Sequence, residues 1–276
     1  MEEPYFFAVN GYRLFAMAHR PADHAAPVAV VVCHPYGEEK QLSYPVLTRW
    51  GRMLAHDGFP VLRFDSRGYG DSDGDIEDAT LESQVGDTLA AARSARERLG
   101  TQKVAYLGLR LGGLVAGLAA ERDAAAAGLV LWSPVVSGKQ YVDEMIRRRL
   151  FGELLSKRRT TREQVLEELA TAGRIEIEGN YLTRTFVEEM SAADLATAAG
   201  SFRGPVLVSA LKNAAGTGDP TCEMLARAYE ARGARCTLEV SGERPYWERS
   251  AMYDHYFPEE LFELTRRWMR AQWQAA

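Results

Sequence analysis

Tyr106-Leu107-Gly108-Leu109-Arg110-Leu111-Gly112-Gly113 is the stretch that decides the fold. An apolar run from Lys103 precedes its turn and predicts a strand, and the Ala- and Gly-rich run Leu114 to Ala120 predicts a helix after it. Glycines on both sides of one central residue let the strand and the helix cross closely. The stretch therefore predicts that the side chain of Arg110 stands at the tip of a strained turn, above a helix N-terminus.

A connection of this shape resembles the nucleophile elbow, G-x-S-x-G, whose central serine attacks a carbonyl carbon. Arg110 occupies the serine position in this chain. A guanidinium group stays protonated and offers only hydrogen-bond donors, so it cannot be that nucleophile. The stretch thus predicts the scaffold for an acyl-enzyme reaction without the attacking atom.

The composition is that of one ordinary globular protein. The chain has 276 residues, 46% of them hydrophobic, and a net charge of −5, so we expect no nucleic-acid partner. Its 3 cysteines are too few and too scattered for a disulfide framework or a zinc site, and we expect no metal and no cofactor. The acidic start, Met1 to Pro4, and the absence of a long apolar run predict no signal peptide, no transmembrane segment and a cytoplasmic location.

Strand-like and helix-like runs alternate along most of the chain, which predicts parallel β-α-β units. A hairpin is predicted around Asn10-Gly11. We predict further strands over Pro27–Cys33, Phe59–Phe64, Lys103–Leu107, Gly128–Trp132, Pro205–Leu211 and Ala234–Val240. We predict helices over Tyr44–His56, Leu81–Leu99, Leu114–Ala120, Cys222–Arg232 and Pro258–Trp273. The expected fold is a mixed, mostly parallel sheet with helices on both faces.

The pattern changes over residues 135–202, where charged amphipathic helices replace the strands. We predict that residues 1–134 and 203–276 form an α/β core and that 135–202 form a helical cap over the carboxyl ends of the strands. In the cap we predict two helices, Tyr141–Leu155 and Thr161–Ala172, with a capping box of Thr160 and Glu163 before the second. We also predict a hairpin or extended arm between Arg174 and Leu182, followed by a short helix capped by Ser191 or Asp194.

Three motifs together resemble one family. His34-Pro35-Tyr36-Gly37 matches an oxyanion-hole H-G-x-G, the loop Asp65 to Ser72 matches D-x-R-G-x-G-x-S, and the elbow completes the set. In this order they resemble the serine aminopeptidase-like branch of the α/β-hydrolase superfamily. The resemblance implies that His34 braces the oxyanion turn, the alternative being a catalytic role. The Tyr36 and Leu111 amides can converge beside the helix N-terminus as an anion-binding nest, and Asp65 is expected to support the pocket.

A narrower resemblance is to the exosortase A system-associated hydrolase 2 group. It rests on Gly108–Gly112, Leu131–Tyr141, Gly179–Thr183 and Gly242–Trp247. Arginine commonly occupies the nucleophile position in that group. The resemblance implies that an arginine at position 110 is a feature shared with that group, but it does not indicate which reaction, if any, the group catalyses.

The other members of a Ser-His-Asp triad are hard to find. Asp219 is the only acid in the loop after the Pro205 strand, and it also suits a helix N-cap. The base position near Gly242–Tyr246 holds no histidine; His255 follows later and also suits a structural role. Arg110, Asp219 and His255 are therefore the candidate catalytic residues. Displaced nucleophiles would be Ser43, Ser66 or Ser133, and Cys33 suits an inert core thiol.

Charged residues near the predicted site leave alternatives open. Glu38 and Glu39 suit a solvated loop, a pair with Arg67 or Arg110, or a general base. The basic runs Arg147–Arg149 and Lys157–Arg159 suit the wet faces of cap helices, or a patch for a membrane or an acidic partner.

Two roles remain for Arg110. It can bind the anionic group of a small molecule or acyl chain under the cap, since a guanidinium at a helix N-terminus suits carboxylate or phosphate. It can instead pair with an internal acid such as Asp219, Glu38 or Asp65 and plug the site, because an unpaired buried cation is costly. The function is then that of a retired hydrolase, of an enzyme with non-serine chemistry, or of an ester or thioester hydrolase or acyltransferase with a displaced nucleophile. A homodimer remains open.

Overall fold

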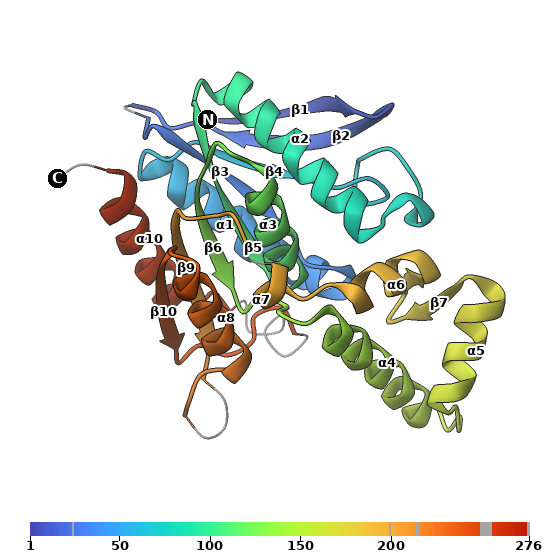
Figure 1. Cartoon of the computed structure of the whole chain (residues 1–276). Coiled ribbons are helices and arrows are strands. Elements are labelled where there is room, and N and C mark those ends of the chain that lie inside the picture. The colour runs from blue at the N-terminus through green and yellow to red at the C-terminus, as the bar shows by residue number, and fades with distance from the viewer. Residues whose placement is uncertain (24, 199, 213–215, 249–255, 275–276) are drawn as a thin grey trace.

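The computed structural model describes residues 1–23, 25–198, 200–212, 216–248 and 256–274. Strands β1 to β6, β9 and β10 form one sheet in the order β1-β2-β4-β3-β5-β6-β9-β10 (Figure 1). β1 and β2 form the predicted hairpin, β2 pairs antiparallel with β4, and the remaining neighbours are parallel. The bounds are β1 Glu2–Val9, β2 Tyr12–His19, β3 Val28–Cys33, β4 Val61–Phe64, β5 Lys103–Leu109, β6 Ala126–Trp132, β9 Pro205–Leu211 and β10 Arg235–Ser241.

Helices cover both faces of the sheet, as the sequence predicted (Figure 1). Successive residues of β3 show why its sequence is apolar throughout: Val31 packs into the core on one face, and Val30 and Val32 pack into the core on the other. The face of Val31 is covered by α2 (Leu81–Leu99), α3 (Leu111–Arg122) and α8 (Pro220–Ala231), and the opposite face by α1 (Gly37–His56) and α10 (Glu259–Trp273). A short helix, η1 (Ile76–Asp78), precedes α2.

The segment between β6 and β9 projects beyond the sheet (Figure 1). It consists of α4 (Gly138–Leu155), α5 (Arg162–Ala172), the hairpin β7 (Arg174–Ile177) and β8 (Asn180–Thr183), α6 (Arg184–Ala192) and α7 (Leu195–Ala198). α4 begins soon after β6 ends, so the segment leaves the sheet at its carboxyl edge. We propose that residues 135–202 form a cap on the core, which consists of residues 1–134 and 203–276.

The predicted start of α1 was wrong. The helix starts at Gly37 and not at Tyr44, and it continues through Pro45, although an interior proline lacks an N–H donor and crowds the preceding turn. Glu38 and Glu39 therefore lie in a first helical turn, where acidic side chains suit the helix dipole, and not in a solvated loop.

The capping box of α5 pairs Thr161 with Gln164, one residue later than the predicted Thr160 and Glu163. At α7 the side chain of Asp194 accepts from the amide of Thr197, whereas Ser191 lies inside α6.

Within the described ranges, no helix is long and apolar enough to cross a membrane. In the same ranges, no three His, Cys, Asp or Glu side chains gather in a way that would hold a metal ion.

The close crossing of the start of α3 and the end of β3 depends on Gly112, where a Cβ would lie 2.1 Å from the carbonyl oxygen of Cys33. Because backbone must move to admit a methyl group, we expect Gly112→Ala to lower the free energy of unfolding by about 3 kcal/mol. Gly86→Ala, in the middle of α2, has nothing within 4 Å of its Cβ and should be neutral or stabilising by about 0.5–1 kcal/mol. Urea unfolding measures both; equal midpoints for the two variants would contradict the close crossing.

Candidate functional site

Arg110 lies at the apex of the turn between β5 and α3. Its φ of 52° and ψ of −119° are unusual for a residue with a side chain, as expected of a strained turn. The surrounding backbone holds it there: its N–H donates to the carbonyl of Trp132 at 3.1 Å, and its own carbonyl accepts from Gly113 at 2.9 Å and Val135 at 3.0 Å. The turn is therefore fixed from both sides, and the side chain leaves it at the carboxyl edge of the sheet.

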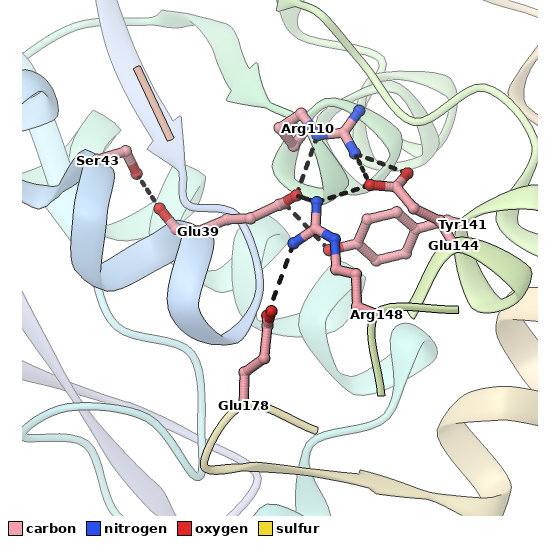
Figure 2. Close-up of polar contacts among 7 residues, drawn as sticks. All are labelled: Glu39, Ser43, Arg110, Tyr141, Glu144, Arg148 and Glu178. Atoms are coloured by element: carbon pink, nitrogen blue, oxygen red, sulfur yellow. Dashed lines mark hydrogen bonds and ion pairs between the residues drawn. The ribbon is translucent and has the colours of Figure 1, made fainter. Parts of the chain in front are cut away.

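Two carboxylates bind the Arg110 guanidinium (Figure 2). Nε lies 3.2 Å from Oε1 of Glu39, and Nη2 lies 3.0 Å from Oε2 and 3.2 Å from Oε1 of Glu144. Glu39 comes from the first turn of α1 and Glu144 from α4, so the cation is held between the core and the 135–202 segment. Of its predicted partners, Asp65 binds Lys40 and Asp219 caps α8. Glu39 was predicted as an alternative partner, and Glu144 was missed.

Glu39 is the buried centre of this arrangement, with only 2% of its side chain exposed. Besides Arg110, its Oε1 accepts from Nη2 of Arg148 at 3.1 Å, and its Oε2 accepts from the Tyr141 hydroxyl at 3.1 Å. A buried carboxylate is costly unless charged donors and hydrogen bonds compensate its lost hydration. These three donors supply that compensation.

Arg148 closes the cluster from α4 (Figure 2). Its Nη2 lies 2.6 Å from Oε1 of Glu144, one helical turn away, and its Nη1 lies 3.8 Å from Oε2 of Glu178. The prediction that the run Arg147–Arg149 forms only a wet face was therefore wrong for Arg148, whose side chain is 24% exposed and points at the site. Arg110 and Arg148 alternate with Glu39 and Glu144, so the inner charges balance.

Aromatic rings flank the guanidinium as well. Cζ of Arg110 lies 5.6 Å from the ring centroid of Tyr141 and 5.5 Å from that of Trp247, distances at which a cation is attracted to a ring face. Trp247 is buried and lies just after the segment in which a catalytic histidine was sought. The sequence reasoning missed this residue; its only signal was its place in the stretch Gly242–Trp247.

The opposite charges in the cluster shift one another's pKa values toward the charged forms. Burial alone would lower the pKa of Arg110, but the carboxylates of Glu39 and Glu144 outweigh it and raise that pKa, so the guanidinium stays charged. Burial likewise would raise the pKa of Glu144, but Arg110 and Arg148 bring it below its ordinary value. Burial, with Glu39 beside it, raises the pKa of the Tyr141 hydroxyl, which therefore donates as a neutral phenol.

Of the other predicted triad members, the structure describes Asp219, which serves as a helix cap. Asp219 is the N-cap of α8, and its Oδ1 accepts from the amide and the hydroxyl of Thr221 at 2.8 and 2.7 Å. This is the helix-cap role that the sequence allowed. His255 lies outside the described residues. Of the two candidates in the described ranges, Arg110 lies at the apex of the turn and Asp219 at the start of α8.

The predicted supporting residues lie beside the turn. Tyr36 directly precedes α1 and Leu111 begins α3, and both are buried. A Cβ at Gly112 would lie 2.7 Å from the His34 carbonyl oxygen, so the start of α3 touches the loop before α1. The two helix N-termini are therefore neighbours, as an anion-binding nest requires.

His34 and Asp65 each have a local partner. Nδ1 of His34 lies 2.8 Å from the Pro35 carbonyl oxygen, and burial together with the nearby Lys40 ammonium lowers the pKa of this imidazole. Asp65 accepts from Nζ of Lys40 at 2.6 Å. Both side chains hold the loops beneath the site.

The displaced serines have structural contacts. Ser43 is buried and its hydroxyl donates to the Glu39 carbonyl at 2.7 Å. Ser66 is buried, and Ser133 lies in a left-handed conformation with φ of 42°. In the part of the chain that the structure describes, no hydrogen bond joins a serine hydroxyl to a histidine ring. Burial raises the pKa of the Cys33 thiol to about 12, which matches its predicted inert role.

A cavity of about 180 Å³ opens beside Arg110, between α4 and the start of α8. Its polar and charged lining consists of Arg110, Ser137, Gln140, Tyr141, Glu144, Arg147, Asp219 and Thr221. A small molecule entering here would meet the side of the guanidinium that Glu144 occupies.

Comparison with known proteins shows the family and the fold of the chain. A family model described as serine aminopeptidase, S33, matches residues 25–212. Est1E from Butyrivibrio proteoclasticus, solved with ferulic acid bound, superposes with a TM-score of 0.69 at 19% identity, covering 97% of this chain and 98% of that one. A sequence comparison with curated proteins gives no significant match.

Two further structures share the architecture. The Pyrococcus furiosus esterase Pf2001 has a TM-score of 0.69 at 14% identity, over 100% of this chain and 92% of that one. An α/β serine hydrolase homologue from Coxiella burnetii has a TM-score of 0.60 at 16% identity, over 96% of both chains. At such identities the likeness shows the fold.

The lowered pKa of Glu144 predicts a pH dependence. A carboxylate whose folded pKa is depressed stabilises the protein fully above its unfolded pKa, and this contribution is lost as the pH falls through the folded value. Near neutral pH, we expect Glu144→Gln to lower the free energy of unfolding by about 1 kcal/mol, a value reduced for partial exposure. The difference from the native protein should start to shrink as the pH falls below the ordinary 4.5 and vanish once the pH has fallen through the lower pKa of Glu144 in the folded protein.

Chemical denaturation across that pH range measures the difference. Glu188→Gln, an exposed change on α6, is the matched control and should show no such dependence. A native-to-Glu144→Gln difference that stays constant into strong acid would contradict the ion pair.

Proposed function

Because the chain belongs to the serine aminopeptidase S33 family, we propose that it is an α/β-hydrolase-fold protein that binds a small anionic or acyl-type molecule beside Arg110 without forming an acyl-enzyme. One observation carries the proposal. A charged guanidinium, held by Glu39 and Glu144, stands at the apex of the β5–α3 turn, where the elbow of this fold presents a serine.

Acyl-enzyme formation needs a nucleophile with a base in reach. Arg110 has no lone pair to offer, and the neighbouring carboxylates keep it charged. Trp247, which follows the segment where the catalytic histidine was sought, packs against its guanidinium, and Asp219 is engaged as a helix cap. These contacts support a site that binds and orients an anion.

The unequal burial of the two carboxylates indicates where a ligand would enter. Glu39 is 2% exposed and has three donors, whereas Glu144 is 34% exposed and borders the cavity. A ligand carboxylate would take the place of Glu144 on Nη2 of Arg110, leaving Glu39 in position. The exposed Arg147 at the cavity adds positive charge on the approach.

A fluorophosphonate probe tests the absence of an acyl-enzyme. We expect no stoichiometric labelling of the native protein, and the same rates for native and Arg110→Met protein on ester and thioester substrates, with a serine esterase as the positive control. Stoichiometric labelling would overturn this part of the proposal and favour the displaced-nucleophile hydrolase; Ser133→Ala and Ser66→Ala would then locate the nucleophile.

Calorimetric titration with butanoate and octanoate tests the binding. We expect Glu144→Gln to bind them about tenfold more tightly than the native protein, because the internal competitor has lost its charge, and Arg110→Met to lose binding. Glu188→Gln serves as the control. Absence of binding by both the native and the Glu144→Gln protein would reject the ligand site and leave Arg110 as an internal plug.

A further inference from the structure

The end of α4 carries three large apolar side chains that are open to solvent. Phe151, Leu154 and Leu155 are 62%, 63% and 70% exposed. They are three and four residues apart, so they share one face of the helix. Apart from Met1, no large apolar side chain in the described ranges is as exposed as these. Such clustering marks an interaction site more often than single exposed residues do.

The first half of the same helix, in contrast, is buried on its apolar face. Tyr141, Val142, Met145 and Ile146 are buried against the rest of the protein. The second half runs outward to the far end of the 135–202 segment (Figure 1). The apolar face at the end of α4 therefore lies away from the core and from the Arg110 site.

Basic residues surround this face. Arg147 lies one turn before Phe151 on the helix, and Lys157, Arg158 and Arg159 follow the helix end; all four are exposed. The acid within this stretch, Glu153, is 16% exposed and lies 3.9 Å from Arg149 and 3.5 Å from Arg158, so its charge is compensated locally. The helix end is thus apolar and basic in a chain whose net charge is −5.

We propose that this tip patch, formed by Phe151, Leu154, Leu155, Lys157, Arg158 and Arg159, docks the protein reversibly on a lipid surface that contains anionic headgroups. Leucine and phenylalanine beside lysine and arginine are what an interfacial segment uses: the apolar groups enter the headgroup boundary and the cations meet the anionic lipids. The charge of the patch favours this occupant over a second copy of the chain, which would bring the same positive charges face to face. This inference is independent of the proposed function.

Co-sedimentation with vesicles tests it. We expect the full chain to bind vesicles of phosphatidylcholine mixed with phosphatidylglycerol, to bind pure phosphatidylcholine much less, and to be released by salt. The triple variant Phe151→Ser, Leu154→Ser, Leu155→Ser should bind about tenfold more weakly, and so should Lys157→Glu combined with Arg159→Glu. Because these side chains are exposed, circular dichroism and the melting temperature should stay unchanged.

The matched control is Met224→Ser combined with Arg227→Glu, an exposed apolar and basic pair on α8. It should bind like the native protein. The proposal is overturned if the native chain does not bind anionic vesicles above the phosphatidylcholine level, or if the triple variant binds as well as the control. It is equally overturned if the triple variant instead converts a dimer to a monomer in analytical ultracentrifugation, since the tip would then be an interface between two copies.

Discussion

A guanidinium removed from water needs carboxylates around it, and this requirement governs the region around the β5–α3 turn. The strained backbone fixes where the Arg110 side chain starts, and only 16% of that side chain remains exposed. Glu39 and Glu144 must therefore supply the compensating charge. Since these carboxylates lie on α1 and α4, the ion pairs of Arg110 connect the core to the 135–202 segment. The ion pairs are thus as much a structural clamp as a site.

The pairing of Arg110 with carboxylates also distinguishes this turn from a nucleophile elbow that carries a serine. The fold retains a strand–turn–helix elbow and neighbouring helix N-termini, both of which favour negative charge. A serine there would need a histidine; an arginine needs acids, and its surroundings differ accordingly. Trp247 flanks the cation, Asp219 caps a helix, and Tyr141 donates to Glu39. A site with these residues can bind an anion, provided that the anion displaces one of the carboxylates that pair with Arg110.

The fold could be predicted from the sequence because its signals are local: buried strands read as continuous apolar runs, and Gly108 and Gly112 mark the crossing at the turn. The partners of Arg110 could not be fully predicted. The helix was predicted to start at Tyr44, which placed Glu39 in a loop, whereas α1 starts at Gly37 and buries the Glu39 side chain. Glu144 lies on another element, and no local pattern says which side of α4 faces the turn. Glu39 was foreseen as one alternative, whereas Arg148 and Trp247 needed the three-dimensional structure.

The most direct measurement is a double-mutant cycle on Arg110 and Glu39, with the free energies of unfolding of Arg110→Met, Glu39→Gln and the double variant measured at neutral pH. If the buried pair organises this region, each single change upsets the charge balance that Arg110 and Arg148 make with Glu39 and Glu144, and the double variant should recover part of the loss. We predict a coupling free energy of about 2 kcal/mol or more. Additivity of the two changes within about 0.5 kcal/mol would contradict the account.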